Sequence, residues 1–185
     1  MIETYKDFNK TYTPEVSEAY PTEAAICNAL SFAGYVLPQG LYPTNADSLA
    51  NFMKDNENVD NFYKNYSPTL YKEYRSKMPG RYLPIDVVQV LIQSVNLWLE
   101  KDILNFEELT VEEIHEKVSN GNPVLIIATD NNTRSLIPIL GIDDKSEWVA
   151  AMENTTIKEL SAGIIKPTYS DKKWVITIKP AEPVI

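Results

Sequence analysis

The hydrophobic and polar positions of the chain follow two different periods, one before about residue 120 and one after it. In the first part, apolar residues recur three and four positions apart, which is the spacing of the buried face of a helix. In the second part, short apolar runs are separated by turn residues, as in strands. The predicted helices cover residues 24–37, 45–54, 84–100 and 110–119. The predicted strands cover residues 124–128, 135–142, 148–152 and 174–178, with 102–106 as a short strand or connector.

Residues that favour helix ends mark three of these helices. Thr22 is expected to cap the first helix, which Gly34 helps to end. Thr44 is expected to cap the second helix. The strongest signal is the capping box formed by Thr110 and Glu113, which opens the last helix. Helices followed by antiparallel strands indicate the α+β class.

The chain has 185 residues, enough for one domain with a hydrophobic core of its own. We expect an N-terminal arm over residues 1–20 and a mainly helical lobe over residues 21–118. An antiparallel sheet lobe follows over residues 119–179, and residues 180–185 form a tail. The helical part is expected to pack on the sheet.

The composition excludes some classes of protein. A formal net charge of -9 and a pI near 4.7 argue against nucleic-acid binding, because duplex binding depends on Lys and Arg that neutralise phosphates. A single cysteine cannot form an internal disulfide. The first residues lack an apolar run of signal-peptide length, and no run approaches the roughly 20 apolar residues that cross a bilayer. We therefore expect a non-secreted protein without membrane insertion, made in the cytoplasm.

The sign of the charge reverses between residues 62 and 82, where basic residues alternate with tyrosines. Surfaces that combine aromatic and cationic side chains can stack on bases or bind an acidic protein partner. In the alternative interpretation, the tyrosines are half-buried and the basic residues are their solvated neighbours. The candidate partner-binding residues are Tyr63, Tyr66, Tyr71, Lys72, Tyr74, Arg75, Lys77 and Arg81.

A second candidate site surrounds the only cysteine, Cys27. The segments concerned read CNALSFA at residues 27–33, GNPVLII at 121–127, RSLIPILGID at 134–143 and MEN at 152–154. In this order they resemble the papain-like, C39-like cysteine peptidases of bacteria and phages. The resemblance implies a papain-like fold in which the helix that carries Cys27 packs on the C-terminal sheet. Residues 40–105 carry no motif of the family.

The chain departs from the catalytic residues that this resemblance implies. Cys27 stands at the position of the nucleophile, but the position of the general base carries Ser135, with Arg134 beside it. Neither side chain accepts a proton near neutral pH. Asn154 stands where the third catalytic residue is found, yet it would have no histidine to orient. No glutamine precedes Cys27 to help build an oxyanion hole. We therefore expect no catalytic residues, with Cys27, Ser135 and Asn154 as vestigial positions.

The only histidine, His115, lies in the predicted helix over residues 110–119 among glutamates. We expect it to be exposed; in an active enzyme it would have to serve as the base for Cys27. One cysteine and one histidine leave too few soft ligands for a zinc site, and the glycine motifs that bind phosphate are absent from the sequence. No metal and no cofactor are therefore expected.

These observations predict a non-catalytic structural or protein-binding component whose partners are other subunits of a large assembly. Phage members of the resembled family, and a composition rich in Asn, Lys, Ile and Tyr, point to a virion or tail component of a bacteriophage. The alternatives are an active cysteine peptidase or acyl-transfer enzyme with Cys27 as nucleophile, and an inhibitor that sequesters a peptide.

Overall fold

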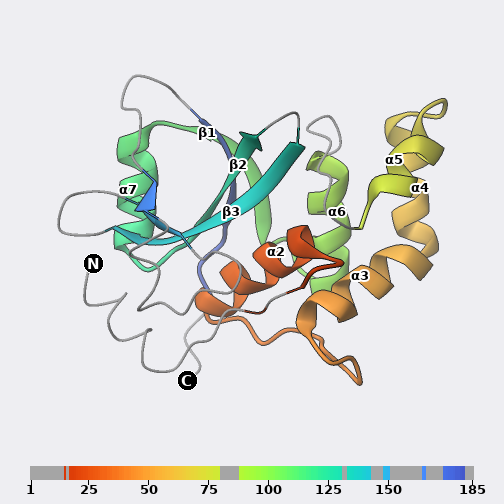
Figure 1. Ribbon diagram of the computed structural model, residues 1–185, viewed down its shortest axis with the longest axis horizontal. Helices are drawn as coiled ribbons and strands as arrows, with labels where there is room; N and C mark the ends of the chain where they lie inside the picture. Colours follow the sequence, from red (N-terminus) through yellow and green to blue (C-terminus); the bar gives the residue numbers. More distant parts are fainter. Residues whose placement is uncertain are drawn as a thin grey trace.

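The structure is a computed structural model that describes residues 15, 17–79, 88–130, 133–142, 148–150, 164–165 and 173–181. The described helices are α2 (Pro21–Phe32), α3 (Asn45–Asp55), α4 (Glu57–Tyr66), α5 (Tyr71–Lys77), α6 (Val88–Leu99) and α7 (Val111–Ser119). The described strands are β1 (Leu104–Leu109), β2 (Val124–Asp130), β3 (Thr133–Ile142), β4 (Trp148–Ala150), β5 (Ile164–Ile165) and β6 (Lys173–Ile178). In Figure 1 the sheet stands between α7 on one side and α2 to α6 on the other. The α+β class predicted from the sequence is confirmed.

The strands form one sheet in the order β1-β6-β2-β3-β4-β5, and all neighbouring strands are antiparallel. β6 lies between β1 and β2, so that Leu104 pairs with Ile178 and Val124 pairs with Thr177. The four predicted strands are therefore present, and the short segment near residue 104 is a full edge strand. β1 and nearly all of α7 precede residue 119, where the sheet lobe is predicted to begin, and β1 belongs to the sheet.

The sheet separates two hydrophobic cores. Along β2, Leu125 faces the larger core, which α2, α3 and α6 complete. Its neighbours Val124 and Ile126 face the smaller core under α7. Successive side chains of a strand point to opposite faces, so a strand covered on both faces is apolar at every position. This double burial explains why residues 124–127 read as a continuous apolar run.

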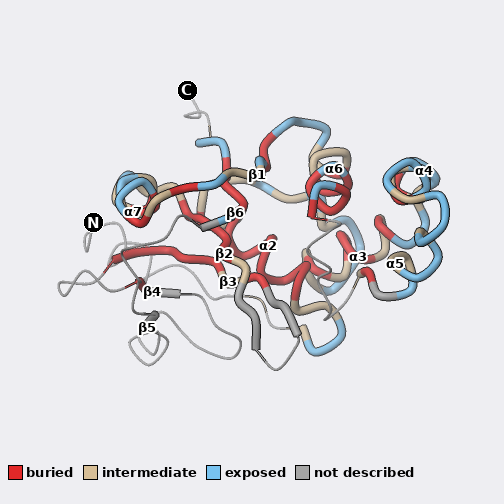
Figure 2. Tube along the Cα trace, turned by 90° about the horizontal axis from the view of Figure 1, so that it is seen from above, coloured by how far each residue is buried: buried red, intermediate tan, exposed pale blue. Residues whose placement is uncertain are grey.

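Helix α2 is the centre of the larger core. Figure 2 shows it buried along nearly its whole length, whereas α4 and α5 present exposed residues at the periphery. The helix is shorter than predicted, because it ends at Phe32 rather than near residue 37. Gly34 has φ +98°, the Gly34 amide donates to Ser31 O at 3.1 Å, and the Tyr35 amide donates to Leu30 O at 3.1 Å. This pair of bonds is a Schellman motif, which closes a helix at a glycine.

The start of α2 also corrects a prediction. Thr22 is not the capping residue, because the helix begins one residue earlier, with Pro21 in its first turn and Tyr20 before it. Proline suits this position since its ring fixes φ and it has no amide hydrogen to leave unsatisfied. The other two predicted caps are confirmed: Thr44 accepts a bond from the Asp47 amide, and Thr110 forms a complete capping box. The predicted helix over residues 84–100 is described from Val88 onward.

Candidate functional site

The side chain of Cys27 is fully buried in the core around α2, with an exposed fraction of 0%. It lies beyond the first turn of the helix, where the favourable effect of the helix dipole on a thiolate has faded. Burial raises the pKa of the Cys27 thiol well above its ordinary value of 9.0, and the carboxylates of Glu15 and Glu23 raise it further. The sulfur is therefore shielded from solvent, and its thiolate form is disfavoured.

The residue after the cysteine has a structural role. The Asn28 side-chain oxygen accepts a hydrogen bond from the Glu15 amide at 2.7 Å, and its Nδ2 donates to Glu15 O at 3.1 Å. The Glu15 carboxylate in turn accepts bonds from the amides of Asn45 at 2.9 Å and Ala46 at 3.0 Å. Amides at the start of a helix such as α3 have no acceptor within the helix itself, and the Glu15 carboxylate supplies one. Glu15 thus joins α2 to α3, a connection that the sequence pattern did not reveal.

His115 lies on the other side of the sheet from Cys27. Helix α7 covers the smaller core, and the His115 ring meets the buried Trp148 ring edge-on, with 6.0 Å between ring centroids. Burial lowers the pKa of His115 from 6.5, an effect that Glu112 partly opposes. The prediction of an exposed histidine is therefore wrong: the side chain is half-buried. The sheet lies between His115 and Cys27.

The register of β3 bears on the position expected for a catalytic base. Leu136 belongs to the core around α2, whereas Ile137 and Ile139 belong to the α7 side. In the backbone register of β2 and β3, Ser135 pairs with Ala128 and Arg134 pairs with Thr129. Asn154 lies outside the described residues.

Helices α4 and α5 carry most of the aromatic and basic candidates, and two of these make contacts within the fold: Tyr63, which is buried, and Arg75, which is half-buried. The Tyr63 ring is fully buried, and burial raises the pKa of its hydroxyl. Arg75 Nη2 donates to the carbonyls of Met53 and Lys54, the latter at 2.9 Å, and its guanidinium lies 5.5 Å from the Tyr63 ring centroid. Arg75 also lies 3.6 Å from Asp60. Tyr63 and Arg75 therefore hold α5 against α3 and α4.

The remaining candidates lie at the surface. Tyr66 is 45% exposed and its ring centroid lies 6.2 Å from that of the half-buried Tyr74. Leu70, between the two helices, is 44% exposed. Lys72 is exposed, and Tyr71 is half-buried beneath the Lys64 ammonium. The side chain of Lys77 and all of Arg81 lie outside the described residues.

The basic charge of this surface is reduced by internal pairing. Lys64 Nζ lies 2.8 Å from Asp60 Oδ2, and a hydrogen bond from Lys64 lowers the pKa of the Asp60 carboxyl. Arg75 is directed to the same carboxylate. Among polar and charged neighbours, α4 and the turn before α5 expose two large apolar side chains, Tyr66 and Leu70, and Lys72 is exposed on α5. We call the exposed Tyr66 and Leu70, together with the half-buried Tyr74, the α4–α5 patch.

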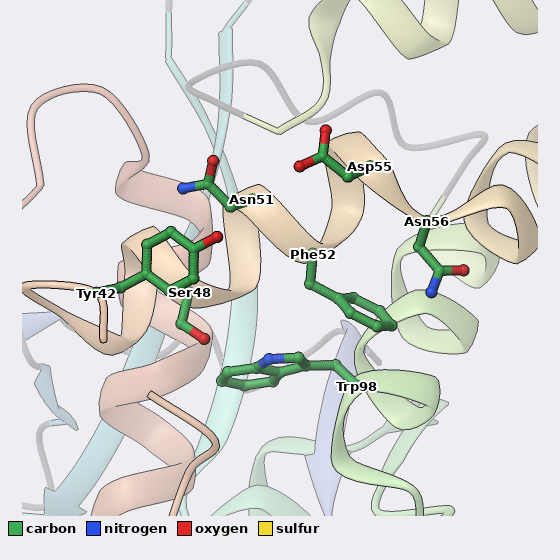
Figure 3. Close-up of a pocket in the computed structure, with 7 residues that line it drawn as sticks. All are labelled: Tyr42, Ser48, Asn51, Phe52, Asp55, Asn56 and Trp98. Atoms are coloured by element: carbon green, nitrogen blue, oxygen red, sulfur yellow. The ribbon is translucent and has the colours of Figure 1, made fainter. Parts of the chain in front are cut away.

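A groove of about 350 Å³ lies between α3 and α6. Figure 3 shows Trp98 of α6 at its floor, with Ser48 and Phe52 of α3 directed toward the indole and Asn51 and Asp55 on the other side of the helix. The complete lining is Tyr42, Ser48, Asn51, Phe52, Asp55, Asn56 and Trp98. Three of these are aromatic, and the other four are polar or charged.

Comparison of the chain with protein-family models, with curated proteins and with solved structures gave no match. Within the described residues, no group of three or more His, Cys, Asp or Glu side chains could hold a metal ion. The described helices are also too short or too polar to cross a bilayer. The features of the described chain that bear on its function are the surroundings of Cys27, the α4–α5 patch and the groove between α3 and α6.

Proposed function

We propose that this protein is a non-catalytic, protein-binding component with a degenerate papain-like, C39-like fold, and that it acts as a subunit of a larger assembly such as a phage virion or tail. The observation that carries the proposal is the environment of Cys27. A nucleophilic cysteine needs a thiolate, an accessible sulfur and a base. Here the sulfur is buried and two carboxylates disfavour the thiolate.

The missing base strengthens this proposal. The ring of His115, the only histidine of the chain, contacts Trp148 of the core on the opposite face of the sheet. Loss of a general base alone costs about 10²- to 10⁴-fold in rate. Burial of the nucleophile adds to that loss, because a substrate carbonyl cannot reach the sulfur. The helix that carries Cys27 is therefore best understood as a core element.

The proposed binding function draws on the surface of α4 and α5. The α4–α5 patch presents two aromatic rings and one leucine on helices that Arg75 holds in place. Aromatic residues dominate the central contacts of protein interfaces. A complex with the native partner should therefore weaken about tenfold or more in the double variant Tyr66→Ala, Tyr74→Ala. The matched variant Lys72→Ala, at the side of the patch, should bind nearly as well as the wild type.

The reactivity of Cys27 tests the non-catalytic part of the proposal. We would measure its rate of alkylation by iodoacetamide between about pH 6 and pH 9, with glutathione as the free-thiol reference. The native protein should react far more slowly than glutathione at every pH, and the denatured protein should react as a normal thiol. Rapid alkylation of the folded protein below pH 8 would show an activated nucleophile and overturn the proposal.

A further inference from the structure

The turn that follows α7 carries the sequence Asn120-Gly121-Asn122-Pro123. It connects the helix to β2, which lies inside the sheet between β6 and β3. Asn120 is exposed, and the chain contains no other Asn-Gly pair. An asparagine that precedes glycine can lose its side-chain amide without an enzyme, because glycine has no Cβ to hinder the reaction. The turn therefore holds a chemically labile group.

The reaction requires only the chain itself and water. The Gly121 nitrogen loses its proton and bonds to Cγ of Asn120, while the Cγ–Nδ2 bond breaks and the amide group leaves with a proton as ammonia. The product is a cyclic imide, which water opens at either carbonyl. Attack at Cγ gives aspartate, and attack at the main-chain carbon gives isoaspartate, in which the main chain runs through Cβ. Both products carry a carboxylate in place of a neutral amide.

The folded turn holds the reacting atoms apart. Asn120 has φ -87° and ψ 11°. At this ψ, the Gly121 nitrogen is nearly eclipsed with the main-chain nitrogen of Asn120 and is turned away from Cβ. Ring closure requires the Gly121 nitrogen on the side of Cβ and close to Cγ. The main chain must therefore rotate about the Cα–C bond of Asn120 before the new bond can form.

Two hydrogen bonds oppose this rotation. The Gly121 amide donates to Val118 O at 3.0 Å, and the Asn122 amide donates to Lys117 O at 3.0 Å. Together with φ +81° at Gly121, these bonds form a Schellman motif at the end of α7. The first bond also engages the N–H group that must lose its proton. Both bonds break when the Asn120 Cα–C bond rotates, so the reaction requires an opening of the last turn.

The packing of α7 on the sheet controls how often the turn opens. Val118, in the last turn of the helix, is 1% exposed and belongs to the smaller core. Val124, the first residue of β2, is fully buried in the same core. The core therefore holds the chain on both sides of Asn120, whose own side chain is accessible to water.

We propose that Asn120 is a site of spontaneous deamidation whose rate is controlled by the opening of the last turn of α7. The product carries a negative charge at the C-terminal end of the helix, which the helix dipole disfavours. Isoaspartate also lengthens the main chain between α7 and β2. Deamidation therefore weakens the end of α7. This inference is independent of the proposed function, because neither Cys27 nor the α4–α5 patch takes part in it.

Mass spectrometry of the full chain, incubated at neutral pH and then digested, measures the deamidated fraction at Asn120. The reference is a synthetic peptide of residues 115–125 in the same buffer, which is too short for a stable helix. The folded protein should deamidate about tenfold or more slowly than the peptide, because most molecules hold the turn closed. Equal rates in the protein and the peptide would overturn the proposal.

Two core substitutions separate local opening from global unfolding. Val118→Ala removes packing under the last turn of α7 and should raise the deamidation rate about three- to tenfold. Val59→Ala, at a fully buried position of the core around α2, is the matched control and should deamidate like the wild type. Circular dichroism would establish that both variants are folded. An unchanged rate in Val118→Ala, or an equal rise in both variants, would overturn the proposed control by the turn.

The variant Asn120→Asp reproduces one of the two products. Its melting temperature should be about 1–4 °C below that of the wild type, because the new charge lies at the C-terminal end of α7. Asn120→Gln keeps a neutral amide and should melt close to the wild type. Equal melting temperatures of the two variants would refute the weakening of α7 by deamidation.

Discussion

Asn28 holds Glu15 with two hydrogen bonds, accepting from its amide at 2.7 Å and donating to its carbonyl at 3.1 Å. In sequence, the asparagine beside Cys27 belongs to a motif that resembles a peptidase signature. In the structure its polar atoms are used to fix the segment before α2, and Asn28 itself is buried. The same segment caps α3 through the Glu15 carboxylate. The motif therefore serves the architecture of the core.

Replacing Asn28 with alanine should destabilise the fold. The variant Asn28→Ala leaves the Glu15 amide and carbonyl without these partners and loosens the cap on α3, which should cost about 1–3 kcal/mol. Urea denaturation measures the change in the free energy of unfolding. Asn65→Ala, at an exposed position of α4, is the control and should change stability by less than about 0.5 kcal/mol. Equal effects of the two substitutions would refute the structural role.

Arg75 and Lys72 should respond differently to alanine substitution. Arg75 binds two backbone carbonyls near the end of α3 and packs over Tyr63, so Arg75→Ala should cost about 1–3 kcal/mol of stability. Lys72→Ala, at an exposed position on the same helix, should be close to neutral. Thermal and urea unfolding of both variants would check this. Two neutral substitutions would mean that the Arg75 contacts do not stabilise the packing of α5.

His115 should make stability depend on pH near neutrality. Burial lowers the pKa of His115 in the folded state, so between that value and about 6.5 the unfolded chain binds more protons than the folded protein. Its contribution is fully present above pH 6.5, decreases as the pH falls through that value, and levels off below the folded pKa. Urea unfolding at about pH 7.5 and pH 5.5 should show a smaller decrease for His115→Gln than for the wild type.

The comparison is direct because His115 is the only histidine of the chain. Carboxylates also lose charge toward low pH, but they do so equally in the wild type and in His115→Gln. Identical pH dependence in the two proteins would show that the folded environment does not disfavour the charged imidazole.

Glu100 should gain stability when it is replaced by glycine. It follows α6 with φ +57°, and the Lys101 amide donates to Asn96 O at 3.1 Å, which is the same closing bond that glycine permits after α2. A residue with a Cβ is strained in this conformation, so Glu100→Gly should stabilise the fold by about 0.5–1 kcal/mol. Glu100→Ala removes the charge but keeps the Cβ, and it should not give the same gain. A destabilised glycine variant would contradict the strain.

Ala29 should not tolerate a charge. Its side chain is fully buried in the core around α2, so Ala29→Asp places an unpaired carboxylate among apolar groups and should prevent folding. The control Ala19→Asp, at an exposed position before the helix, should fold normally. Circular dichroism and solubility would distinguish the two. A folded, soluble Ala29→Asp protein would show that the packing around α2 is looser than the burial indicates.

Local features of the fold were predictable because they depend on neighbouring residues. Thr44, Thr110 and Glu113 satisfy amides within three positions, and the structure contains these caps. The predicted start and end of α2 differ from the observed ones. Apolar spacing predicts a helix as far as residue 37, whereas Pro21 sets the observed start and the turn at Gly34 sets the observed end. β1 was predicted only as a short strand or connector, because its pairing with β6 joins residues far apart in the chain.

The sequence by itself determined the α+β class, most helix and strand positions, and the residue types around Cys27. Periodicity and capping act over a few positions, so they can be read along the chain. Tertiary structure alone decided that Cys27 and His115 lie on opposite faces of the sheet, that Tyr63 is buried and that Arg75 is half-buried. It also decided that Val36 and Leu41 are exposed. These properties depend on which distant segments cover a side chain, and that packing has no signature in local spacing.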